Sequence, residues 1–318
     1  MPRFPRLAGA LGAAAAALAL LAASPATAVA PPLSDARILV HLDLAAGQMP
    51  ENSAPEPDGS LDVTFLRAAQ IARISPAGGV TVLADLPFEE NPNTPLVGFA
   101  AATGLARAHD GTLYAAYATG TPLTGVYRLD CDGTLTRIAQ LPPDGLPNGL
   151  ALDEEAGVLY SADSAQGVVR RIPLDGGEPT VWASGTLLEP TAFIGANGIK
   201  VHHHAVWVSN TDRGLLLRIP VRHDGTAGPI GTAVEDLGGI DDFTFTGEHQ
   251  DTVLAALNLS NQVAYVNVRD GSRTIVLTAD DGLTSPTSVA VHRSTVFVTS
   301  AAFNPPPDPN VLTARLHR

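Results

Sequence analysis

The stretch Leu146-Pro147-Asn148-Gly149-Leu150-Ala151-Leu152-Asp153 is one copy of a pattern that recurs along the chain. A turn follows it, and then a second β-rich run, Gly157-Val158-Leu159-Tyr160-Ser161-Ala162-Asp163. Related segments return about every 44 to 52 residues, at Pro50-Glu51-Asn52, Ala102-Thr103-Gly104, Pro147-Asn148-Gly149, Ala196-Asn197-Gly198, Ile240-Asp241-Asp242 and Pro286-Thr287-Ser288. A fixed period of this length, with several short strands in each unit, is typical of propellers and repeat arrays. The sequence therefore predicts an all-β, six-bladed propeller.

Each unit divides into about four strand-like runs. In the third unit these are residues 149–152, 157–162, 167–172 and 180–184, separated by turn residues such as Asp175-Gly176-Gly177. The sixth unit lacks a clear fourth run, whereas residues 36–42 precede the first unit and have no place in it. We expect this N-terminal strand to complete the last blade, because that pairing closes the ring and removes an open sheet edge.

The N-terminus predicts a secretory signal peptide over residues 1–28. Arg3 and Arg6 precede an apolar stretch over residues 7–21, and Ala26-Thr27-Ala28 supplies a small-x-small cleavage site. A retained membrane anchor is the alternative, although the apolar stretch is short for a membrane span. We therefore expect cleavage near Ala28, a secreted protein in the extracellular space or cell envelope, and one propeller domain over residues 29–318.

The net charge of the chain limits the classes of partner that it is expected to bind. The net charge is −13, and residues 1–28 hold two arginines and no acid, so the remainder carries about −15. Such a surface is poorly suited to nucleic acid or to anionic membranes, and it suits solubility and cation binding. We expect a small-molecule substrate and a monomer. Cys131, the single cysteine, lies in an expected turn and leaves no internal disulfide.

The six phased positions predict a ring of polar ligands at one channel mouth, because the innermost strand of each blade lines the channel. Four of them, Glu51, Asn148, Asn197 and Asp241, offer two carboxylates and two amide carbonyls. Calcium accepts six to eight oxygen ligands of this mixture, although another divalent cation is an alternative. Each residue taken alone also suits a plain turn. Asp242 remains an alternative to Asp241 as the inward carboxylate.

Several other segments have simpler explanations. Residues 89–102 and 303–310 are rich in proline and asparagine and predict loops, of which the first could overhang the channel mouth. His202-His203-His204 falls where other units have a hairpin turn, and neighbouring strand residues point to opposite faces, which disfavours a metal site. Asn258-Leu259-Ser260 is a glycosylation sequon in a host that glycosylates.

The pattern around Asn148-Gly149, continued by Val169-Arg170-Arg171-Ile172, resembles the SMP-30/gluconolactonase/LRE-like family of six-bladed propellers over residues 36–318. This resemblance implies a calcium ion at the channel mouth, held by one glutamate, one or two asparagines and one aspartate. Carried over residue by residue, it assigns the metal to Glu51, Asn148, Asn197 and Asp241. That ligand set is similar to the arrangement of the diisopropyl-fluorophosphatase branch.

Two positions depart from the family pattern. Thr103 stands where several lactonases have asparagine, and Thr287 or Ser288 stands where the fluorophosphatase type has histidine. The arginine and glutamate that sugar lactonases use to hold a hydroxylated ring have no counterpart that the sequence reveals. These departures weaken the case for a sugar lactone as the substrate.

The leading hypothesis is a secreted, calcium-dependent hydrolase of a lactone or related ester. Asp241 would activate water or attack directly, and Thr103 and Ser288 would hydrogen-bond the substrate. The first alternative is a non-catalytic secreted propeller whose calcium is structural and which binds a ligand or a protein. A further alternative is a strictosidine-synthase-like lyase or cyclase.

Overall fold

The computed structural model describes residues 1–2, 31–305 and 307–317. It divides into two units, residues 1–30 and 31–318, and the second holds all of the strands. The segment expected to be a signal peptide lies almost entirely outside the described residues. Within the described residues, no helix has the length and apolar character needed to cross a membrane.

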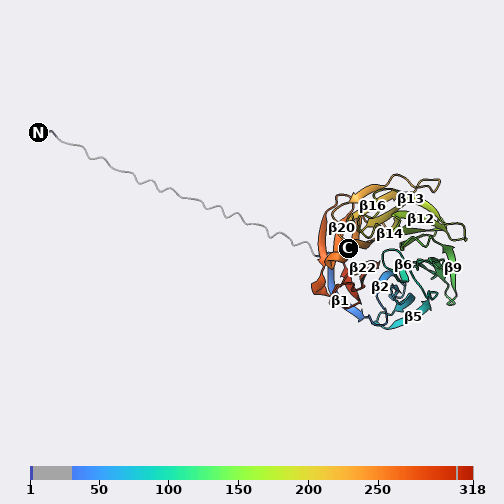
Figure 1. Ribbon diagram of the computed structural model, residues 1–318. Helices are drawn as coiled ribbons and strands as arrows, with labels where there is room; N and C mark the ends of the chain where they lie inside the picture. Colours follow the sequence, from blue (N-terminus) through green and yellow to red (C-terminus); the bar gives the residue numbers. More distant parts are fainter. Residues whose placement is uncertain (3–30, 306, 318) are drawn as a thin grey trace. The chain divides into compact units, whose positions relative to one another are not determined.

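Twenty-four strands in the described residues form six four-stranded antiparallel sheets, which confirms the six-bladed propeller (Figure 1). Blades 1 to 3 contain β2 Pro50–Pro55, β3 Leu61–Phe65, β4 Gln70–Ile74 and β5 Val80–Asp85; β6 Ala101–Arg107, β7 Leu113–Ala118, β8 Gly125–Leu129 and β9 Leu135–Gln140; and β10 Pro147–Asp153, β11 Val158–Asp163, β12 Val168–Pro173 and β13 Thr180–Ser184. Blades 4 to 6 contain β14 Ala196–His202, β15 Ala205–Asn210, β16 Leu215–Pro220 and β17 Gly231–Val234; β18 Ile240–Phe245, β19 Thr252–Leu257, β20 Gln262–Asn267 and β21 Arg273–Leu277; and β22 Pro286–His292, β23 Thr295–Ser300, β24 Asn310–Leu316 and β1 Leu33–His41. Two short 3-10 helices, η1 Asn258–Ser260 and η2 Ala279–Asp281, lie in connections.

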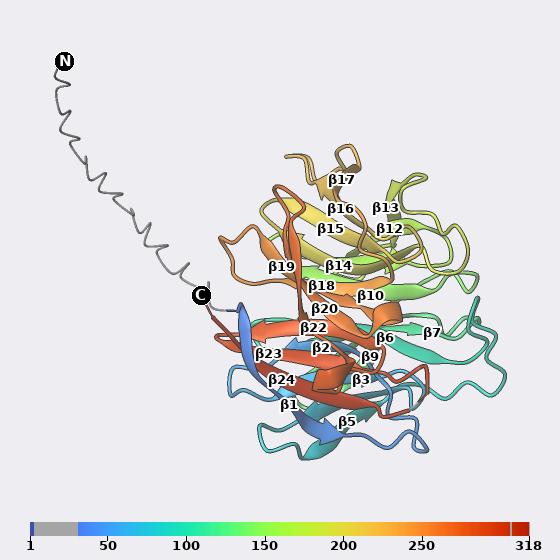
Figure 2. The same ribbon diagram turned by 90° about the vertical axis from the view of Figure 1, so that its left-hand side faces the viewer.

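The N-terminal strand closes the ring, as the sequence predicts. β1 pairs antiparallel with β24 and forms the outer edge of the sixth blade (Figure 2). β1 begins at Leu33, three residues before the expected start at residue 36, and ends at His41, one residue before the expected end at residue 42. The first and last parts of the propeller are therefore joined by backbone hydrogen bonds.

Apolar clusters between neighbouring blades hold the ring together. In the described part of the chain, each of the six blade interfaces has its own cluster of buried side chains. Tyr160 of blade 3 and Val206 of blade 4, for example, belong to one cluster and are both buried. Burial on both faces of each sheet explains why the apolar alternation along the strands is imperfect.

All six inner strands share an irregularity near their first residues. The pairing of β2, β6, β10, β14, β18 and β22 with the next strand of the same blade shifts register within the first few residues. A β-bulge of this kind re-aims side chains and is frequent next to active sites. Every phased position of the sequence, from Glu51 to Thr287, falls within such a bulge.

Glycine within the bulge lets neighbouring inner strands approach closely. A Cβ atom on Gly149 would lie 2.3 Å from the Asn197 carbonyl oxygen, and one on Gly104 would lie 2.2 Å from the Asn148 carbonyl oxygen. Any side chain at these positions would push the blades apart. The repeated Asn-Gly pair is therefore a packing requirement as well as a turn signal.

Removal of the closing strand should destabilise the whole propeller. We expect deletion of residues 29–44 to lower Tm by roughly 10 °C or more, because about 1 kcal/mol corresponds to about 2–4 °C in chains of this size. Calorimetry of the deletion beside a chain that begins at residue 29 measures this. Equal Tm values would show that β1 contributes little to the ring.

Substitution of Gly149 by alanine should cost stability through backbone contact. We expect a loss of roughly 2 kcal/mol or more for Gly149→Ala, since the Asn197 backbone has to move. Gly238→Ala is the matched control, because a Cβ there meets no atom of the described residues within 4 Å. Equal unfolding curves for the two variants would contradict the close approach.

Candidate functional site

The predicted ligand residues occupy equivalent places on four inner strands. Glu51, Asn148, Asn197 and Asp241 are each the second residue of β2, β10, β14 and β18, and all are less than 9% exposed. Neighbouring inner strands contact one another around the whole ring. The bulges thus bring these four side chains to the end of the channel where the inner strands begin, which we call the mouth.

Asp241 is held by two amide groups. Its Oδ1 accepts a hydrogen bond from Asn197 Nδ2 at 2.8 Å, and its Oδ2 accepts one from Asn258 Nδ2 at 3.1 Å. Burial raises the pKa of Asp241 well above its usual range, as do the charges of Glu51 and Asp242, and the two amide hydrogen bonds oppose this shift. The carboxylate is oriented by donors on β14 and η1.

Asn258 therefore has a structural partner in place of a glycan. Its side chain is buried and also donates to the Pro286 carbonyl oxygen at 3.2 Å. A sugar chain could not be attached to this amide in the folded protein. This role could not be predicted from the repeat, since Asn258 lies seventeen residues after Asp241 and outside the phased positions.

Glu51 is the least satisfied polar group of the ring. Its Oε2 is buried, and no hydrogen-bond donor of the described residues reaches it. Burial, followed by the charge of Asp242, raises the pKa of Glu51 to about 8. No basic side chain in the described part of the chain forms an ion pair with Glu51 or Asp241. Two buried carboxylates without a cation are costly, and they are satisfied by protonation or by a bound metal.

Asp242, one residue further along β18, has a different environment. Its Oδ1 lies 2.6 Å from Lys200 Nζ, and its Oδ2 accepts a hydrogen bond from Ser288 Oγ at 3.1 Å. Asn52 Nδ2 lies 3.5 Å from the same Oδ2. Asp242 is thus neutralised by a lysine of blade 4, while Asp241 lies beside the ring residue Asn197.

The predicted substrate-binding hydroxyls are engaged within the fold. Thr103 Oγ1 donates to the Pro147 carbonyl oxygen at 2.7 Å, and Thr287 Oγ1 donates to the Pro50 carbonyl oxygen at 2.8 Å. These bonds tie blade 2 to blade 3 and blade 6 to blade 1. Thr287 occupies the ring position of blade 6, whereas Ser288 contacts Asp242 and lies 3.2 Å from Ser53 Oγ.

Lys200 lies where the other blades have small residues. It is the only lysine of the chain. The equivalent residues of the other blades are Ala54, Ala106, Ala151, Thr244 and Ala290. Together with Lys200, they line a cavity of about 370 Å³ at the far end of the channel. Sequence reasoning missed Lys200, although a long charged side chain at a position of small residues was a usable signal.

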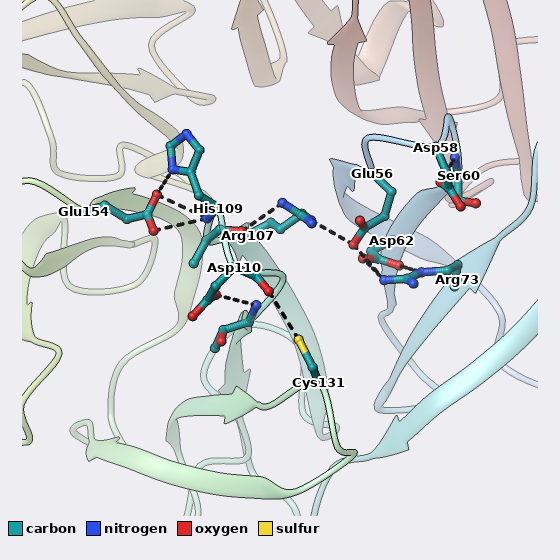
Figure 3. Close-up of polar contacts among 12 residues, drawn as sticks. Glu56, Asp58, Ser60, Asp62, Arg73, Arg107, His109, Asp110, Cys131 and Glu154 are labelled. Atoms are coloured by element: carbon teal, nitrogen blue, oxygen red, sulfur yellow. Dashed lines mark hydrogen bonds and ion pairs between the residues drawn. The ribbon is translucent and has the colours of Figure 1, made fainter.

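The far end of the channel also holds an ion-pair network between blades 1 and 2 (Figure 3). Glu56 Oε1 accepts from Arg73 Nη2 at 2.7 Å and from Arg107 Nε at 2.8 Å, and Arg73 Nε donates to Asp62 Oδ1 at 2.7 Å. Burial raises the pKa of Asp62 to about 6 despite its contact with Arg73. Each of these charged groups has an oppositely charged partner, so the network links blade 1 to blade 2.

The mouth is apolar outside the acidic ring. Met49, Leu66, Ala101, Leu146 and Ala301 belong to one cluster, and three of them lie at or directly before the start of an inner strand. Six of the ten exposed large apolar side chains of the described residues lie in mouth-side connections: Leu44, Phe88, Leu96, Phe193, Leu259 and Phe303. The mouth thus combines the polar ring of the inner strands with apolar side chains of the connections.

The loop of residues 89–102, for which an overhang of the mouth and a plain surface loop are the two expectations, is anchored in its first half. Thr121 Oγ1 donates to Glu89 Oε2 at 2.6 Å, and the Asn93 amide donates to the Thr119 carbonyl oxygen at 2.8 Å. These contacts bind the loop to the β7–β8 turn of its own blade. Its second half brings Phe99 into the apolar cluster of the mouth.

The ring residues fit a calcium ion. In the described residues, no group of three or more histidine, cysteine or acidic side chains is arranged for a metal, so a metal here would need the amide oxygens. Two carboxylates and two amides provide that donor set. The partnerless Glu51 Oε2 and the raised carboxyl pKa values indicate where a divalent charge would be accommodated.

Comparison with known proteins gives likeness of fold. No protein-family model matches the sequence, and no curated protein does. A luciferin-regenerating enzyme superposes with a TM-score of 0.65 at 11% identity, covering 88% of this chain and 95% of that one. A gluconolactonase from Xanthomonas campestris gives 0.63 at 17% identity, covering 93% and 99%.

The chain has a gluconolactonase-like propeller fold. Virginiamycin B lyase from Staphylococcus aureus shares the fold as well, with a TM-score of 0.60 at 16% identity and coverage of 85% and 82%. The predicted resemblance is thus confirmed for the architecture. Since hydrolases and lyases both use this propeller, the reaction has to be argued from the site residues.

Stability of the calcium-free propeller should fall as the pH rises. The folded state holds a proton on Glu51 up to about pH 8, whereas the unfolded chain releases it near pH 4.5. A raised pKa in the folded state therefore stabilises at low pH, and that contribution is lost as the pH rises from about 4.5 to about 8. We expect Tm to decline over this window in chelator and to recover with calcium.

Glu51→Gln separates this effect from those of Asp241 and Asp62, whose pKa values are also raised. The variant should show a shallower decline of Tm with pH and little response to calcium. Calorimetric scans between pH 5 and pH 8, with and without calcium, measure both proteins. Identical profiles for the two proteins would exclude Glu51 as the source.

Proposed function

We propose that this propeller is a secreted, calcium-dependent hydrolase of a lactone or a related ester, acting as a monomer on a small molecule. The observation that carries the proposal is the buried ring at the mouth, where Glu51 and Asp241 lack a basic partner in the described residues. Asn197 donates to Asp241, and Asn148 holds the equivalent position of blade 3, where it donates to Ser164 Oγ. Apolar side chains around a polar ring suit a small organic substrate whose ester or lactone carbonyl reacts at the ring.

Calcium held by Glu51, Asn148, Asn197 and Asp241 would supply Lewis-acid polarisation of the substrate carbonyl. Asp241 is the residue to activate water or to attack the carbonyl carbon. Asn197 and Asn258 fix its two oxygens, so that the carboxylate keeps one orientation. A carboxylate that also binds a metal is a weak base, and close positioning compensates for that.

A non-catalytic propeller with a structural calcium is the second candidate. It is favoured by the hydroxyls of Thr103 and Ser288, which already have partners inside the fold and are both buried. Under this alternative the ring binds calcium without turnover, and the mouth binds a ligand. A lyase or cyclase is a third candidate, which rests on likeness of fold alone.

Asp241→Asn should abolish turnover while preserving the fold. We expect a loss of at least about 100-fold in kcat/KM on a panel of lactones and aryl esters, because Asn can neither accept a proton nor attack. Asp236→Asn is the matched control, since Asp236 is exposed in the loop that leads to the same strand. Hydrolysis assays with calcium and with chelator measure both variants.

Calcium binding itself is measured by calorimetric titration of the metal-stripped protein beside Asp241→Ala. One site in the parent that is lost in the variant would support the ring as the metal site. Tight binding without hydrolysis of any ester or lactone would favour the non-catalytic alternative. Full activity in Asp241→Asn would remove Asp241 from the mechanism.

A further inference from the structure

A second cavity opens on the mouth side, beside the ring. It measures about 470 Å³ and lies between the β1–β2, β3–β4, β5–β6 and β23–β24 connections, where its walls include Leu44, Met49, Arg67, Phe99 and Phe303. Met49 is two residues before Glu51, so this cavity and the ring share one segment of chain. No predicted site residue lines it.

Arg67 is the feature that sets this cavity apart. Its guanidinium carbon lies 4.2 Å from the centre of the Phe99 ring, and its side chain forms no hydrogen bond or ion pair with the described residues. Arg218 likewise has no acidic partner among the described residues, so what distinguishes Arg67 is its place in the wall of an apolar cavity. Stacking on Phe99 holds it in place and leaves its donors free for a ligand.

The far end of the channel offers a contrast. Lys200 pairs with Asp242, Arg73 and Arg107 pair with Glu56, and His109 contacts Glu154. The cations of that cavity are therefore satisfied by the protein itself. The mouth-side cavity combines an available cation with aromatic and aliphatic walls, which is the chemistry that recognises an apolar carboxylate.

We propose that the Arg67–Phe99 cavity binds the apolar, carboxylate-bearing part of the substrate, with the carboxylate on Arg67 and the ring or alkyl group against Phe99 and Phe303. This inference rests on the hydrolase function proposed above and names its substrate class: an ester or lactone with an aryl or alkyl group that ends in a carboxylate. The reacting carbonyl lies over the ring, and the anion lies away from Glu51 and Asp241.

The test measures binding separately from catalysis. The probe is 3-phenylpropionate, with 3-phenylpropionamide as its uncharged counterpart, titrated by calorimetry into the calcium-free protein and into Asp241→Asn. We expect the carboxylate to bind, and Arg67→Gln to weaken it by about 10-fold or more, because a charge-assisted contact is lost. The amide should bind Arg67→Gln as well as it binds the parent. Phe99→Leu should weaken both probes.

Arg218→Gln is the matched control, since Arg218 is also exposed and lies 5.8 Å from the Trp207 ring on another part of the propeller. Its binding of both probes should equal that of the parent. No binding of either probe, or equal binding by Arg67→Gln and the parent, would overturn the proposal. Because this assay measures binding without calcium, and in Asp241→Asn as well as in the parent, its failure is distinct from failure of the hydrolase function.

A kinetic measurement tests the link to turnover. With esters that differ only in a terminal carboxylate or amide, Arg67→Gln should raise KM for the anionic ester about 10-fold and leave kcat unchanged. The neutral ester should show the same kinetics in both proteins. A change in kcat with an unchanged KM would contradict a binding role for Arg67.

Discussion

The mouth ring depends on the bulge that begins every inner strand. The phased residue of each unit lies within the bulge, and the glycine that follows it at positions 104, 149 and 198 lets the next blade approach to backbone contact. Hydroxyls such as Thr103 and Thr287 then bond to the carbonyl of the neighbouring strand. Fold closure and site geometry thus come from the same few residues per blade.

Two carboxylates on adjacent positions of β18 have opposite surroundings. Asp242 meets Lys200, Ser288 and Asn52, so its charge is balanced by the protein. Asp241 meets only amide donors and lies near the charge of Glu51, which raises its pKa. The charge of Asp242 is therefore balanced within the protein, whereas the negative charge of Asp241 and Glu51 is not. Only the second pair of carboxylates would be stabilised by a bound cation.

The mouth-side connections carry a surface that differs in character from the acidic ring. Apolar side chains collect there, while the outer strands expose few of them, and Arg67 lies among them without an acidic partner in the described residues. Connections tolerate sequence change because they form few of the hydrogen bonds between strands. In our proposal, substrate recognition therefore lies in the connections, and the inner strands hold the metal ring. The same division is found in many propellers, where one scaffold serves different reactions.

The sequence by itself determined the number of blades, the strand that closes them and the phase of Glu51, Asn148, Asn197 and Asp241, because a repeat places equivalent residues at equivalent points of a closed ring. The tertiary structure decided which side chains meet. Asn258, Lys200 and Arg67 lie outside the phased positions, and their partners Asp241, Asp242 and Phe99 come from different strands or connections. Contacts across blades depend on side-chain direction and on the distance between strands, and neither is encoded by period alone.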